Sequence, residues 1–298
     1  MKGNNRMKMP NEEKWREEIV ELVKAGNISE DDLDKLSNIY LYYAPASLFK
    51  YCSPKQRNLD NIRDRKMWFS APSEFNDVFD CRMAVSFDLF EKMAREIVPN
   101  NVNMQPGSQA WKKMKKAARQ LQRQTEEQFD ALRHEMGIAC FSENEYSLLM
   151  WAHYASNHKG ICVEYNMEDF ISELGFSPVP VIYSVERAAI EEYVPNDSES
   201  LKQPFIDSLI RKSKEWEYEK EWRIIRDKGA CGEKWKGNGA LLDSVKPLSI
   251  ILGCDCSHEV EDEIEAHCKS EKISLYKMEI DKALYKLNKK SILEFEDL

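Results

Sequence analysis

Hydrophobic residues recur along this chain in two patterns, which predict short strands separated by helices. Alternating or continuous apolar runs bounded by turn residues predict strands, and apolar positions three and four residues apart predict helices. Helices and strands interleave without the strict alternation of a doubly wound sheet, so we predict an α+β fold with a mixed sheet and flanking helices. The expected strands are 48–51, 67–70, 137–144, 158–165, 179–183, 249–252 and, as the final strand, 273–278.

The same patterns predict how the chain is divided. Residues 1–45 are expected to be a helical extension, because Trp15, Ile19 and Leu22 repeat at helical spacing. Residues 46–298 are then a single α+β domain with a helical insertion at about 87–136. The insertion carries a thin apolar stripe in a Gln- and Lys-rich run, which is typical of an exposed helical hairpin. A lid, a partner surface and a decoration are all compatible with it.

Composition and charge exclude several classes of function. The 298 residues carry a formal net charge of −9, which argues against broad nonspecific binding to nucleic acid, although a local basic surface stays possible. No signal peptide and no apolar run of about 18 residues is present, so we expect a cytoplasmic protein without a membrane partner.

The eight cysteines are scattered, and we expect them to be reduced. Cys254, Cys256 and His258 are of the residue types that bind zinc, but their spacing matches no usual zinc pattern. We therefore expect no metal cofactor.

An acidic run at 216–225 is the strongest candidate for chemistry. If it is extended, Glu217, Glu219, Glu221 and Arg223 lie on one face, opposite an apolar face that includes Trp222. Repelling carboxylates on one face require a cationic partner, a metal ion or a function for a perturbed carboxyl. The alternative is a solvated acidic edge next to a helix that ends near Trp216.

Two further segments present polar groups among aromatic ones. The loop 71–80 is expected to be held by its phenylalanines while Asn76 and Asp77 face outward, unless those two only satisfy the turn. On the predicted helix at 147–155, His153 and Tyr154 border a possible cleft or belong to the core. No phosphate loop, nucleophile elbow or zincin motif is present.

Taken together in order, these motifs resemble the bacterial domain-of-unknown-function family DUF2971 over roughly residues 46–255. That family commonly has a proline after the Asn-Asp pair, where this chain has Val78. The motifs that carry the resemblance are Leu48 to Tyr51, Trp68-Phe69-Ser70, Phe75-Asn76-Asp77, Phe79-Asp80, Cys140-Phe141-Ser142, Met150 to Tyr154, Lys159 to Glu164 and Tyr218 to Arg223.

The order of elements is also similar, more weakly, to ADP-ribosyltransferase folds, in which a split, mixed sheet holds NAD in a central cleft. This similarity implies that Glu221 stabilises the oxocarbenium-like transition state and that Glu219 orients an acceptor. Lys50 or Tyr51 takes the first-strand position, where such enzymes usually have Arg or His. The residues implied to contact NAD are Phe69, Ser70, Asn76, Asp77, Phe141, Ser142, Trp151, His153 and Tyr154.

Three hypotheses for function follow. The first is an NAD-consuming enzyme, such as a toxin or antiphage effector, that takes a nucleotide-type small molecule and modifies a macromolecular acceptor. The second is a metal-dependent phosphodiesterase or nuclease that uses Asp77, Asp80 and Glu219 or Glu221 around Mg²⁺. The third is a non-catalytic module with an aromatic groove formed by Trp68, Trp151, Trp216 and Trp222.

Overall fold

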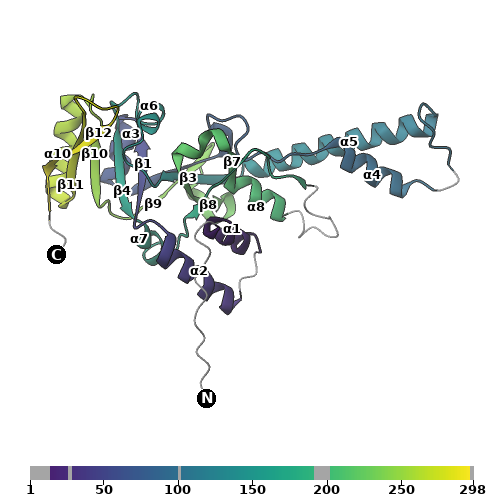
Figure 1. Ribbon diagram of the computed structural model, residues 1–298, viewed down its shortest axis with the longest axis horizontal. Helices are drawn as coiled ribbons and strands as arrows, with labels where there is room; N and C mark the ends of the chain where they lie inside the picture. The colour runs from purple at the N-terminus through teal and green to yellow at the C-terminus, as the bar shows by residue number, and fades with distance from the viewer. Residues whose placement is uncertain (1–13, 26–28, 100–101, 191–201, 296–298) are drawn as a thin grey trace, which may run out of the picture.

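The fold is built around one mixed sheet, with a helical extension and a long helical hairpin attached to it (Figure 1). The computed structural model describes residues 14–25, 29–99, 102–190 and 202–295. The strands are β1 (Ser47–Cys52), β2 (Lys66–Ser70), β3 (Met136–Ser142), β4 (Ile161–Asn166), β5 (Val179–Pro180), β6 (Ile182–Ser184), β7 (Arg211–Ser213), β8 (Glu221–Asp227), β9 (Gly239–Asp243), β10 (Ser249–Leu252), β11 (Ser274–Ile280) and β12 (Leu287–Leu293).

Helices connect these strands and cover the sheet. They are α1 (Trp15–Ala25), α2 (Glu30–Tyr43), α3 (Gln56–Arg63), α4 (Phe87–Ile97), α5 (Gln109–Arg133), α6 (Leu148–His153), α7 (Met167–Ser172), α8 (Lys202–Ile210), α9 (Lys228–Cys231) and α10 (His258–Glu271), together with the 3-10 turns η1 (Pro72–Glu74), η3 (Lys214–Glu219) and η4 (Gly232–Lys234).

The main sheet has ten strands, and its order is β12-β11-β10-β4-β1-β3-β2-β9, with β8 on β3 and β5 on β8. β10 and β11 pair in parallel, whereas the other pairs in this sheet are antiparallel. All four residues of β10 are buried, which explains why this strand is a continuous apolar run rather than an alternating one. The sheet is thus mixed and its centre forms the core.

The sheet divides at β3. All seven residues of β3 pair with β8 along one edge. Along the other edge, β1 pairs only at Ser142 and β2 pairs only at Ile138. The two strands therefore diverge, and within the described chain the three β3 residues between these points have no strand partner on that edge. This gap determines where the cavity described below can form.

The N-terminal helices pack on the sheet beside β8. α2 begins with a capping box, in which Ser29 and Asp32 exchange hydrogen bonds with each other's backbone. In α1, Ile19 is fully buried and the Trp15 ring stacks on Trp222 with centroids 5.9 Å apart. The extension is thus docked on the sheet. The part of it at 1–13 lies outside the described residues.

Helices α4 and α5 form the helical hairpin that was predicted as an insertion at about 87–136. The hairpin projects from the end of the sheet opposite α10 (Figure 1). α5 is 25 residues long and is capped at its N-terminus by Ser108, whose hydroxyl accepts from the Trp111 amide at 3.1 Å. Phe90 of α4 and Met114 and Ala118 of α5 are buried. The hairpin therefore has a small apolar seam of its own.

The α+β class with a mixed sheet is confirmed, while the ADP-ribosyltransferase-like order is not. The strand predicted at 273–278 is present as β11, but the prediction that it is the final strand was wrong, because β12 follows it as an edge strand. Neither β9 nor β12 was predicted, since Gly239–Asp243 has only three apolar residues between a glycine and an aspartate, and Leu287–Leu293 is largely polar. None of the described helices has both the length and the apolar character needed to cross a bilayer.

Candidate functional site

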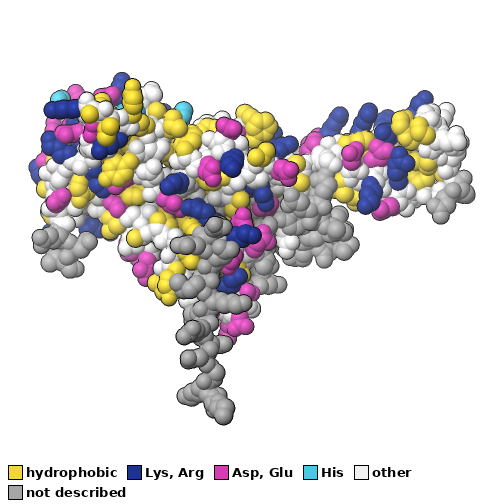
Figure 2. Space-filling model, viewed as in Figure 1, with side chains coloured by type: hydrophobic (Ala, Val, Ile, Leu, Met, Phe, Trp, Pro, Cys, Tyr) yellow, Lys and Arg dark blue, Asp and Glu magenta, His cyan; other side chains and the backbone are white. Residues whose placement is uncertain are grey.

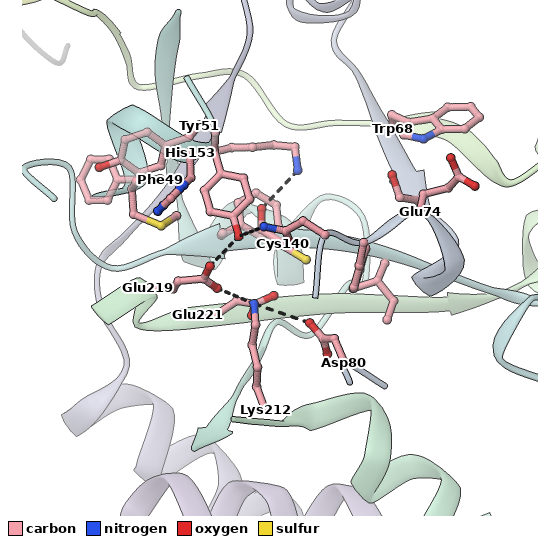
Figure 3. Close-up of a pocket in the computed structure, with 18 residues that line it drawn as sticks. Phe49, Tyr51, Trp68, Glu74, Asp80, Cys140, His153, Lys212, Glu219 and Glu221 are labelled. Carbon is pink, nitrogen blue, oxygen red and sulfur yellow. Dashed lines mark hydrogen bonds and ion pairs between the residues drawn. The ribbon is translucent and has the colours of Figure 1, made fainter. Parts of the chain in front are cut away.

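A cavity of about 350 Å³ lies in the gap between β1 and β2 (Figure 3). Its floor is the unpaired edge of β3, and its walls come from the loop after β2, from α6 and from the segment that precedes β8. The residues that line it are Phe49, Lys50, Tyr51, Trp68, Ser70, Glu74, Phe75, Asn76, Asp80, Ile138, Cys140, Phe141, Met150, His153, Tyr154, Lys212, Glu219 and Glu221.

One wall of the cavity is a buried cluster of charges centred on Lys212. The Lys212 ammonium lies 2.5 Å from Glu219 Oε2, 3.0 Å from Glu221 Oε2 and 3.5 Å from Asp80 Oδ2 (Figure 3). All four side chains are at least nine-tenths buried. A single ammonium thus holds the two neighbouring carboxylates of the acidic run together with Asp80, which is far from them in the sequence.

Arg223 is the second cation of this cluster and has no exposed surface. Its Nη2 donates to both oxygens of Asp80, at 2.9 and 2.7 Å, and its Nε donates to Glu221 Oε1 at 2.8 Å. Nη1 donates to the Leu209 carbonyl at 2.7 Å. Buried guanidinium groups require such saturation, because an unpaired buried charge is very unfavourable.

The cluster holds three carboxylates and two cations, so it carries one excess negative charge when all groups are ionised. Burial opposes ionisation of Glu221, but Arg223 and Lys212 outweigh it and hold the pKa of that carboxyl below its ordinary value. Burial raises the pKa of Glu219, with Lys212 opposing this shift and Glu221 adding to it. The two neighbouring carboxyls therefore differ in proton affinity.

The two carboxylates also differ in free hydrogen-bonding capacity. Glu221 accepts from Lys212, twice from Arg223 and from the Cys140 thiol. Among the described residues, the Glu219 carboxylate accepts only from Lys212 and, at 2.6 Å, from the Tyr154 hydroxyl. Since a carboxylate has about four acceptor positions, Glu221 is saturated and Glu219 keeps about two.

A tight turn places Glu219 beside Glu221. η3 ends at Glu219, and Lys220 has the left-handed backbone conformation, with φ of 44°, before β8 begins. The Ser142 hydroxyl donates to the Glu219 carbonyl at 2.6 Å, and the Glu221 amide donates to the Tyr183 hydroxyl at 2.7 Å. Side chains on both sides thus fix this turn.

Polar and aromatic groups continue the wall beside Glu219. The Asn76 amide donates to the Tyr154 hydroxyl at 3.3 Å. Burial raises the pKa of Tyr154, and the adjacent Glu219 adds to this shift, so Tyr154 is a neutral hydrogen-bond donor at neutral pH. His153 is exposed and lies near Trp216 and Tyr218, with centroids 6.4 Å from each.

Lys50 places an amine on the cavity floor. Its Nζ donates to the Cys140 carbonyl at 3.2 Å, in the stretch of β3 that lacks a strand partner, and lies 5.1 Å from the Phe141 ring centroid. Burial lowers the pKa of Lys50. Within the described chain no carboxylate lies within 4.0 Å of this amine, so it is suited to receive an anionic group of a ligand.

Most of the predicted site residues converge on this cavity. They are Lys50, Tyr51, Ser70, Asn76, Phe141, His153, Tyr154, Glu219 and Glu221.

Four predicted residues lie elsewhere. Phe69 and Trp151 are in the core, with 1% and 0% of their surface exposed. Ser142 is buried and holds the Glu219 backbone. Asp77 accepts from the Phe79 amide at 2.9 Å, which is the turn role considered as its alternative.

The acidic run is not a continuous strand, because residues up to Glu219 form η3 and only those from Glu221 are extended. Alternation holds within β8, where Glu221 and Arg223 contact each other and Trp222 packs on the opposite side. Glu217 is exposed. The solvated-edge alternative was also wrong, since Glu219 and Glu221 are buried.

Sequence reasoning missed Lys212, the centre of the cluster. It lies in the three-residue strand β7, which pairs with β6 rather than with the main sheet. The repelling carboxylates of the acidic run suggested a cationic partner, but the sequence did not indicate which residue it is. Trp68 and Asp80 were given a functional role in the binding-module and metal hypotheses but not among the NAD-site residues, and both line the cavity.

The side chains are not arranged as the aromatic-groove and metal-site hypotheses require. Trp151 and Trp222 are fully buried, so the four tryptophans do not line one groove. Among the described residues, no group of three or more His, Cys, Asp and Glu side chains has the geometry to hold a metal ion. His258 of the Cys254 segment is exposed.

Comparison with known families identifies a segment around this site. Residues 150–224 match the family described as "Protein of unknown function (DUF2971)". The resemblance to DUF2971 is confirmed over this stretch. It includes Tyr154, Lys212, Glu219, Glu221 and Arg223, and thus much of the charged wall of the cavity. No curated protein and no solved structure matches the chain.

Proposed function

We propose that this protein cleaves the nicotinamide glycosidic bond of NAD and transfers the ADP-ribosyl group to an acceptor. The observation that carries the proposal is the buried, negatively charged wall formed by Glu219 and Glu221 in a cavity that also has aromatic rings and a separate amine. Ligand pockets for small molecules have volumes of about 300–1,000 Å³, so the cavity is large enough for the nicotinamide ribose.

The proposed reaction places its developing charge beside Glu219. The bond between ribose C1′ and the pyridinium nitrogen breaks, the nitrogen keeps the electron pair, and nicotinamide leaves neutral. The ribose then carries oxocarbenium character, which a preorganised carboxylate stabilises most strongly where water is excluded. Glu219 is buried and keeps free acceptor positions, and these properties support it as the carboxylate that faces the ribose.

The similarity to ADP-ribosyltransferases assigns the stabilising role to Glu221, but we give that residue a supporting role, because Lys212 and Arg223 occupy its acceptor positions. Its contacts to Lys212 and Arg223 hold both cations in place behind Glu219. An acceptor hydroxyl or water attacks C1′ and gives its proton to Glu219, whose raised pKa favours that transfer. Lys50 is positioned to attract the diphosphate, and Tyr51, Phe141 and Tyr154 offer ring faces and edges to nicotinamide.

A metal-dependent phosphodiesterase has less support from the same geometry. Asp80, Glu219 and Glu221 do converge, as that hypothesis requires, but Lys212 and Arg223 occupy the position between them. Carboxylates already paired with two side-chain cations are poor ligands for Mg²⁺, because binding would bring positive charges together.

The test is nicotinamide release from NAD by the purified full chain, with and without cell extract, measured by chromatography. Glu219→Gln removes the excess charge of the cluster without changing side-chain size, so the fold is expected to survive. Release should fall by about 100-fold or more, as for loss of other preorganised electrostatic groups. Glu217→Gln on the same 3-10 turn is the matched control, because Glu217 is exposed. No release by folded wild type, or equal release by Glu219→Gln, contradicts the proposal.

A further inference from the structure

The N-terminal two-thirds of α5 carries a concentration of positive charge that contrasts with the rest of the chain. Residues 109–125 hold six Lys and Arg side chains and no Asp or Glu, in a chain whose net charge is −9. Figure 2 shows Lys and Arg side chains gathered over the projecting hairpin. A cluster of charges of one sign on one element is typical of a surface that binds a partner of the opposite charge.

Four of these cations form a line. Lys112, Lys116, Arg119 and Arg123 are spaced by four, three and four residues, which places them on one side of the helix. With a rise of about 1.5 Å per residue, the line is about 16 Å long. All four side chains are exposed, although the Arg119 guanidinium also lies 5.6 Å from the Phe87 ring centroid. We call these four residues the basic stripe.

The basic stripe is not neutralised by the protein. In the described part of the chain, none of its four side chains has an acidic partner within 4.0 Å, whereas Lys115 on an adjoining side pairs with Glu91 at 3.0 Å. The stripe also lies away from the seam with α4, to which Met114 and Ala118 contribute. Like charges three and four residues apart destabilise a helix, so the stripe is unfavourable for folding alone.

We propose that the basic stripe binds the phosphodiester backbone of a nucleic acid. A duplex presents one phosphate per about 3.4 Å along each strand, so four to five phosphates fall within the length of the stripe. The exposed side chains beside it are Lys113, Gln120 and Gln124, which donate hydrogen bonds of the kind that phosphate and sugar oxygens accept. A straight array of evenly spaced cations favours a regular polyanion over the irregular surface of an acidic protein.

The proposal does not depend on NAD cleavage, because the stripe and the cavity are separate. The stripe is a local basic surface of the kind that the net charge of −9 leaves open. The recognised feature is the backbone, so we expect little dependence on base sequence.

The test is fluorescence anisotropy of labelled 20-base-pair DNA, 20-base-pair RNA and a 20-nucleotide single strand, titrated with the full chain without NAD. Four phosphate contacts on a duplex predict a slope of about −3.6 in log affinity against log salt, or a loss of about 100-fold between 50 and 200 mM. The variant Lys112→Gln, Lys116→Gln, Arg119→Gln, Arg123→Gln keeps good helix formers and should lose most of this slope and at least about tenfold in affinity at 50 mM salt.

The matched control removes the same formal charge from exposed positions outside the hairpin, as Lys55→Gln, Arg57→Gln, Lys246→Gln and Lys282→Gln. It should bind like wild type. The three probes identify the preferred nucleic acid, and any of them bound through the stripe supports the proposal. No binding at 50 mM salt, or equal loss in the control and the stripe variant, overturns it and leaves an acidic protein as the partner to test.

Discussion

Replacing Lys212 with methionine tests whether the buried charges hold the cavity wall together. The substitution keeps a similar side-chain volume and removes the ammonium that lies within 3.5 Å of three carboxylates. The cluster then has three carboxylates and one cation, so its excess negative charge rises from one to two. Lys214→Met, at an exposed position on the adjacent 3-10 turn, is the control.

The expected loss follows from two opposing terms. At an effective dielectric constant of about 20, two charges 3 Å apart attract by about 5 kcal/mol. Desolvation of the ammonium costs several kcal/mol, yet removal of one partner of a buried pair still destabilises by about 3–5 kcal/mol because the other charge is left unpaired. We therefore expect Lys212→Met to lower the free energy of unfolding by about 3–5 kcal/mol at pH 7, and Lys214→Met by less than about 0.5 kcal/mol.

The double variant Lys212→Met, Glu219→Gln makes this prediction specific to charge. It returns the cluster to one excess negative charge, so its loss should be smaller than the sum of the single losses by about 1–3 kcal/mol. The measurement is denaturant unfolding followed by both circular dichroism and tryptophan fluorescence. A loss below 1 kcal/mol for Lys212→Met, or strict additivity in the double variant, refutes the reasoning.

The pH dependence provides a further check on the same residues. The pKa of Glu219 is raised in the folded state, so the folded protein binds this proton more tightly than the unfolded chain. Stability from this group is therefore present below its unfolded pKa and is lost as pH rises through its folded pKa. The Glu221 pKa is lowered, so its contribution is present above its unfolded pKa and is lost as pH falls toward its folded pKa.

Three further predictions concern other parts of the fold. Gly253→Ala should cost about 2 kcal/mol or more in unfolding free energy, because a Cβ there meets the His158 carbonyl oxygen at 2.0 Å; Gly237→Asn, in open space at φ of 61°, should cost little. Burial lowers the Lys50 pKa, so Lys50→Met should unfold at the same or a higher denaturant concentration than wild type at pH 7. As pH rises toward the ordinary lysine pKa, the stability of wild type should increase relative to that of the variant. A clear loss of stability in the variant at pH 7 contradicts this. Burial raises the pKa of Cys256 to about 11 and that of Cys52 to about 12, so both thiols should react with a disulfide reagent at pH 8 only after denaturation, as mass spectrometry will show.

Elements with a strong local pattern could be predicted from the sequence. β10 is a short apolar run and α5 has a continuous helical stripe, so each is specified by its own residues. β12 was not predictable in this way, because as an edge strand it carries Lys289 and Lys290 and gains its order from pairing with β11. Local pattern thus identifies elements that carry their own apolar signal better than edge strands that depend on pairing.

The candidate site was predictable in its residue types but not in its assembly. Repulsion between Glu219 and Glu221 indicated a cationic partner, a metal ion or a function for a perturbed carboxyl, and both residues line the cavity. The identity of that cation as Lys212 depends on where β7 lies relative to β8, which is a long-range property of the fold. Likewise, the gap that exposes the Cys140 carbonyl to Lys50 exists only because β1 and β2 diverge from β3.

The most direct test of the central claim is a crystal structure with an NAD analogue whose ribose ring oxygen is replaced by carbon, so that cleavage cannot occur. We predict that the nicotinamide and the carbocyclic ring that replaces its ribose lie in the cavity between β1 and β2. The C2′ or C3′ hydroxyl of that ring should lie within hydrogen-bond distance of Glu219. An empty cavity at millimolar analogue, or the analogue bound at a different surface, contradicts the account.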